Sequence, residues 1–77
     1  MTEKLKLIWD FYGTDALETA KHHCIHLKEF AAIESLPFEK CDVQELGESH
    51  SIAYIVVTRQ HMIPFRDALK PHRGQKA

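Results

Sequence analysis

The chain has 77 residues, with ten lysines and arginines, eleven aspartates and glutamates, and a formal net charge of −1. This length allows one domain with a small core, so we expect a single domain over residues 1–77. The balanced charge argues against the overall basic excess that draws a whole domain onto nucleic acid or anionic lipid.

Residues 5–12 predict the first strand, because their apolar residues recur at every second position and share one face: Leu5, Leu7, Trp9 and Phe11. On the opposite face, Ile8 and Tyr12 alternate with charged residues. We expect these two side chains to need cover from another surface.

Gly13 ends this strand, and Thr14 or Asp15 can cap a helix that runs to about Ser35, where Leu36-Pro37 stops it. An apolar stripe recurs along this helix at helical spacing: Leu17, Ala20, Cys24, Leu27 and Ala31. We expect the stripe to pack on the sheet.

The second half of the chain predicts two strands and a shorter helix. Residues 38–46 carry many charges, as edge strands do, whereas residues 51–58 are apolar on both faces, which is typical of a central strand. A helix holding Met62 to Leu69 follows and ends before Pro71. Residues 71–77 are expected to form a flexible polar tail.

These elements predict an α+β fold in the order β-α-β-β-α. Because strand-helix-strand crossovers are right-handed and the last two strands are joined by a short turn, the third strand should lie between the first two, giving an antiparallel sheet in order 1-3-2 with both helices on one face. This topology is similar to the ferredoxin-like plait without its last strand. The absent strand would leave the first strand unpaired along its outer edge.

A metal site is one functional hypothesis. His22 and His26 are four residues apart, so their imidazoles lie on one helical face and can share zinc or another divalent transition metal. Glu18 and Glu29 extend the same row and could complete the coordination. A solvated face of histidines and glutamates is the alternative, and the sequence fixes no further cofactor.

A small-molecule site near the end of the first strand is a second hypothesis. Asp10, Tyr12 and Thr14 lie where strand and loop meet, a place where clefts form in such sheets. His23 is the fourth candidate, although a boundary histidine resting on the sheet is the simpler interpretation. No residues form a recognisable nucleophile and base pair, so no catalytic residue is assigned.

The function that fits best is a small homodimeric binding or regulatory module, with a ligand held between subunits. Metal binding through His22 and His26 is the alternative. The third class is a compact enzyme of the dimeric α+β barrel type, because Ala20–Phe30 resembles the histidine-bearing first helix of such enzymes. Asp10, His23 or His26 would then be the acid–base candidates, but the missing nucleophile argues against an enzyme.

The remaining expectations concern environment. No apolar stretch is long enough to span a membrane, and no signal-peptide pattern precedes the first strand, so we expect a cytoplasmic protein with no membrane or nucleic-acid partner. Cys24 and Cys41 are not a CxxC pair. We expect two free, mostly buried thiols, with a disulfide or a reactive nucleophile as the alternatives.

Overall fold

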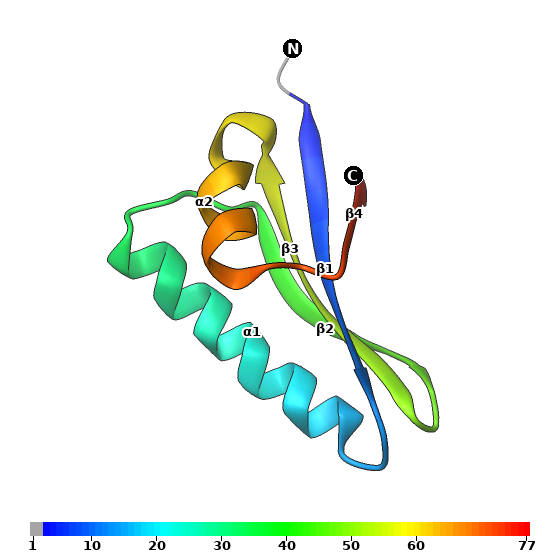
Figure 1. Ribbon diagram of the computed structural model, residues 1–77. Coiled ribbons are helices and arrows are strands. Elements are labelled where there is room, and N and C mark those ends of the chain that lie inside the picture. The colour runs from blue at the N-terminus through cyan, green and yellow to red at the C-terminus, as the bar shows by residue number, and fades with distance from the viewer. Residues whose placement is uncertain (1–2) are drawn as a thin grey trace.

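The computed structural model describes residues 3–77, which form an α+β domain in the order β-α-β-β-α-β (Figure 1). Met1 and Thr2 of the expected domain lie outside the described residues. The elements are β1 (Lys4–Tyr12), α1 (Ala16–Ile33), β2 (Lys40–Gly47), β3 (His50–Thr58), α2 (Arg59–Leu69) and β4 (Arg73–Lys76).

The four strands form one antiparallel sheet in order β2-β3-β1-β4. β1 pairs with β3 over its whole length, from Lys4 opposite Thr58 to Tyr12 opposite His50. The three longer strands therefore lie in the expected order, with β3 between β1 and β2. The α+β class, the antiparallel sheet and the two helices are confirmed.

The expectation of a sheet without a fourth strand is wrong. Arg73–Lys76, expected to belong to a flexible tail, forms β4 along the outer edge of β1 (Figure 1). Its residues are exposed and none is a large apolar residue, so backbone pairing rather than burial holds it. Hydrogen bonds flank the strand: the His72 N–H donates to the Ile8 carbonyl at 3.0 Å, and the Ala77 N–H to the Lys4 carbonyl at 3.0 Å.

Both helices cover the face of the sheet that carries Leu7 and Trp9 (Figure 1). α1 lies mainly over β3 and β2, and α2 over β1 and β3. The expected stripe of α1 is buried except for Leu17, which is half-buried because Ala16 takes the inner position at the helix start. Phe65 of α2 is fully buried, with its ring edge-on to Phe30 at 5.4 Å.

The helix-free face of the sheet is covered largely by its own side chains. Ile8 and Ile52 lie on this face and are only 2% and 3% exposed. The Lys6 ammonium lies 4.2 Å from the centre of the Tyr54 ring and shields it. Ile8 therefore does not need the external cover that we expected, whereas Tyr12 is 73% exposed.

Candidate functional site

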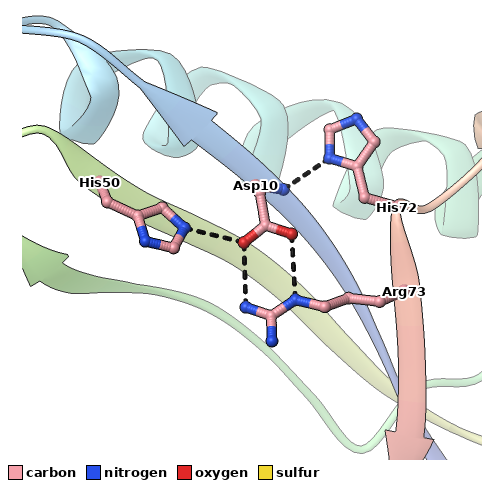
Figure 2. Close-up of polar contacts among 4 residues, drawn as sticks. All are labelled: Asp10, His50, His72 and Arg73. Atoms are coloured by element: carbon pink, nitrogen blue, oxygen red, sulfur yellow. Dashed lines mark hydrogen bonds and ion pairs between the residues drawn. The ribbon is translucent and has the colours of Figure 1, made fainter.

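A cluster of polar residues gathers around Asp10 on the helix-free face (Figure 2). The Arg73 guanidinium donates to both carboxylate oxygens of Asp10, from Nε to Oδ2 at 3.0 Å and from Nη2 to Oδ1 at 2.9 Å. His50 Nε2 lies 2.8 Å from Oδ1. The Asp10 side chain is 11% exposed and the Arg73 side chain 49% exposed, so a mostly buried carboxylate meets a half-exposed guanidinium in a bidentate ion pair with a third partner.

The sheet register brings these residues together. Arg73 pairs with Ile8, and His50 pairs with Tyr12, so each is a diagonal neighbour of Asp10 on the same face. Long side chains reach across such diagonals. The Asp10 carboxylate on β1 therefore connects this strand to His50 on β3 and to Arg73 on β4.

The electrostatics favour an ionised Asp10. Its hydrogen bonds with the Arg73 guanidinium hold the pKa of the Asp10 carboxyl below its usual range, and the His50 contact acts in the same direction, whereas burial opposes both. Asp10 in turn raises the pKa of Arg73. Because three nitrogen donors already surround the carboxylate, Asp10 serves in this structure as an anchor for β4.

His72 extends the pairing of β1 beyond β4. The backbone N–H of Asp10 donates to His72 Nδ1 at 2.8 Å, so this nitrogen must be unprotonated and a neutral imidazole carries its proton on Nε2 (Figure 2). The imidazole thus satisfies an edge amide that the short strand leaves unpaired.

The four residues expected to bind a ligand do not meet in one place. Tyr12 stacks on His50 with ring centres 4.5 Å apart and so joins the Asp10 cluster. Thr14 is exposed in the connection between β1 and α1. His23 lies on the other face of the sheet, 4.9 Å from the Trp9 ring.

His23 is partly buried among aromatic rings. Its Nε2 atom is buried and has no hydrogen-bond partner within residues 3–77. Burial is the main cause that lowers the pKa of His23, and positive charge on the nearby His26 adds to the effect. These observations describe a neutral boundary histidine packed on the sheet.

The expected metal ligands lie on the exposed side of α1. His22 and His26 are exposed, His26 Nδ1 lies 3.5 Å from Glu29 Oε1, and Glu18 pairs with Lys21 at 3.8 Å. Across the described part of the chain, no three histidine, cysteine or acidic side chains come together to hold a metal ion. Metal binding by His22 and His26 stays a prediction.

The sequence interpretation missed His50, His72 and Arg73. The pairing of the first and third strands could have indicated His50, because it places the residue before Ser51 beside the end of β1. His72 and Arg73 carry no such signal, because the polar segment after Pro71 has no alternating apolar residues that would indicate a strand.

A second candidate site is a cleft of about 530 Å³ between α2 and the edge formed by β1 and β4, here called the α2–β4 cleft. Its apolar lining comes from Leu5, Leu7, Met62 and Pro71. The other lining residues are Glu3, Arg59, Arg66, Arg73, Gly74, Gln75 and Lys76.

The composition of β4 leaves this cleft open. Gly74 lies opposite Leu7 and Lys76 opposite Leu5, so both are on the side of the sheet that faces the helices. Gly74 has no side chain to fill the space, and a Cβ atom there would lie 3.6 Å from Leu7 Cδ2, an ordinary contact distance. α2 packs on β1 and β3, which leaves β4 without a helix above it.

The cleft is positively charged although the whole chain is not. Its lining contains four of the ten basic residues and one of the eleven acidic residues, a formal charge of 4 − 1 = +3. Without Arg73, which pairs with Asp10, and Arg66, which pairs with Asp67 at 3.1 Å, the lining keeps 2 − 1 = +1. Glu3 lies between Arg59 at 2.8 Å and Lys76 at 3.7 Å, and the Arg59 hydrogen bond is the main cause of the lowered Glu3 pKa.

Comparisons with protein-family models, curated proteins and solved structures found no significant match for this chain. Neither of the helices formed by the described residues is long and apolar enough to cross a membrane. Functional inference therefore rests on the geometry of the two candidate sites.

The Asp10 anchor predicts that β4 depends on Arg73 and not on positive charge in general. Arg73→Gln removes the bidentate pair and should speed amide exchange in residues 73–76 several-fold, because β4 loses the two charge-assisted hydrogen bonds that tie it to Asp10. Lys76→Gln is the matched control, since the Lys76 side chain is 84% exposed. Hydrogen exchange followed by mass spectrometry measures both, and equal rates in the two variants would contradict the anchor.

The same pair predicts a dependence of stability on pH. The Asp10 pKa is lower in the folded chain than in the unfolded chain, so its stabilisation is present above about pH 4 and is lost as pH falls through the folded pKa. Asp10→Asn should therefore lower the free energy of unfolding more at pH 7 than at pH 2. Urea unfolding at the two pH values tests this, and a constant difference would show that Asp10 does not contribute through its charge.

Proposed function

We propose that the protein is a small binding module whose α2–β4 cleft takes an organic anion with an apolar tail. One observation carries this proposal: an apolar floor and an excess of basic side chains meet in a single cleft. Leu5, Leu7 and Met62 offer contact for the tail. Arg66 and Lys76 would attract a carboxylate, sulfate or phosphate group, which would compete with Asp67 for Arg66 and with Glu3 for Lys76.

The cleft has the size of a small-molecule site, since such sites measure about 300–1,000 Å³. An alkyl chain that buries about six methylene groups gains about 5 kcal/mol from the hydrophobic effect. Association costs oppose this gain, so we expect a dissociation constant of about 1 mM or weaker for a simple alkyl carboxylate.

We further propose that the fold is a complete ferredoxin-like plait. The element order β-α-β-β-α-β and the strand order β2-β3-β1-β4 support this assignment. A shared fold does not carry a function with it, so the ligand proposal depends on the cleft alone.

Decanoate is a direct probe of the cleft. In an NMR titration it should shift backbone amides of α2, β1 and β4, and 1-decanol should bind more weakly because it lacks the charge. Gly74→Leu should weaken decanoate binding at least about tenfold by filling the cleft, and it should not lower stability, because glycine in a strand is unfavourable by about 0.5–1 kcal/mol. Gly47→Leu is the matched control, since Gly47 is the last residue of β2, away from the cleft, with no atom near its Cβ position.

The charge contribution has its own control in the same titration. Arg66→Gln should weaken decanoate binding several-fold, whereas Lys21→Gln makes the same change of net charge on α1, away from the cleft. Equal weakening by the two variants would show non-specific attraction. Unchanged binding in Gly74→Leu would place the ligand elsewhere and overturn the proposal.

We also propose a homodimer that forms through the helix-free face of the sheet. β4 occupies the edge of β1, and the edge strand β2 exposes Lys40, Asp42 and Glu45, so neither edge favours pairing with another chain. Tyr12 is the large exposed aromatic side chain on this face that a partner would cover.

Light scattering should give a mass near twice 8.9 kDa at 100 μM protein, and Tyr12→Ser should return the mass to that of one chain. Ile63→Ser is the control, because Ile63 is an exposed apolar residue on α2, on the opposite side of the sheet. A single-chain mass for the unmodified protein would rule out this dimer.

A further inference from the structure

Cys24 and Cys41 lie in contact between α1 and β2. Their Sγ atoms are 3.3 Å apart, and Cys41 Sγ lies 3.7 Å from the carbonyl oxygen of Cys24. Both cysteines are free thiols, Cys24 buried and Cys41 half-buried. A disulfide holds its sulfurs about 2.0 Å apart, so a further approach of little more than 1 Å would bond them.

The position of this pair matters because the two cysteines are 17 residues apart in the chain and belong to different elements, α1 and β2. Cys24 lies on the buried stripe of α1, and Cys41 lies on β2, the edge strand that α1 covers. A bond between them would tie the helix to the edge strand and close the intervening loop.

The environment of the thiols affects how fast they react with a disulfide. Burial raises the pKa of Cys41 to about 12, and the hydrogen bond with Cys24 acts in the same direction. A thiol with such a pKa carries little thiolate at neutral pH, so it is a poor nucleophile and a poor metal ligand. The pair is therefore suited to slow cross-linking rather than to catalysis.

We propose that Cys24 and Cys41 form a site of reversible oxidation, at which a low-molecular-weight disulfide converts the two thiols into a cross-link between α1 and β2. This proposal is independent of the α2–β4 cleft, which lies beside α2 and contains neither cysteine.

The reaction proceeds by two thiol–disulfide exchanges. Cys41, the more exposed thiol, loses its proton and attacks the small disulfide, which forms a mixed disulfide and releases one small thiol. Cys24 then loses its proton and attacks the Cys41 sulfur, which forms the Sγ–Sγ bond and releases the second small thiol. The two cysteines are oxidised by two electrons in total, and the small disulfide takes up these electrons and both protons.

The test is to incubate the folded chain with oxidised glutathione at pH 8 and to follow its intact mass. We expect a loss of two hydrogens over hours, the disappearance of both alkylatable thiols, and full reversal by dithiothreitol. The cross-linked chain should melt about 10 °C higher than the reduced chain, because closing a loop of this length restricts the unfolded state.

Single variants distinguish the order of the steps. Cys24→Ser should stop at a glutathione adduct on Cys41, and Cys41→Ser should react more slowly because Cys24 is the more buried thiol. The proposal is overturned if the native chain keeps both thiols or forms only bonds between chains. It is also overturned if the cross-link forms only in urea, because the folded geometry would then play no part.

Discussion

The antiparallel ladder between β1 and β3 is the constraint on which the rest of the structure depends. Its register places Leu7 opposite Ile55 and Trp9 opposite Ala53, which sets the surface that both helices cover. The same register puts the other faces of both strands together, so that Asp10 comes within reach of His50. A shift of one residue would exchange the two faces and remove the core and the polar cluster together.

The parts of the fold that follow from hydrophobic pattern could be predicted from the sequence. The stripe on α1 and the doubly apolar β3 specify which surfaces are buried, and the short connection between β2 and β3 specifies their pairing. β4 could not be predicted in this way, because its four exposed residues contribute nothing to the core. β4 is held by interactions between residues far apart in the sequence. These are backbone pairing with β1, the His72 contact with Asp10, and the bidentate ion pair between Arg73 and Asp10.

The candidate sites were harder to predict than the fold because both depend on that strand. Asp10 was identified as a polar residue at a strand end, but its partners lie 40 and 63 residues away in the chain. Net charge was no guide to the cleft, since an overall charge of −1 conceals a lining that carries +3. The fold brings basic residues of α2 and β4, which are separated in the sequence, together in the lining of the α2–β4 cleft.

β4 also connects the two sites, because its residues alternate between the faces of the sheet. Arg73 points toward Asp10 on the helix-free face, while Gly74 borders the cleft on the other face. Burial of side chains contributes little to the stability of β4, because its four residues are exposed. The Asp10–Arg73 ion pair on the helix-free face therefore helps to hold β4 in place as a wall of the α2–β4 cleft on the other face. A ligand that binds only when this wall is formed must stabilise the docked strand, and by linkage a firmly docked strand must tighten the binding of that ligand.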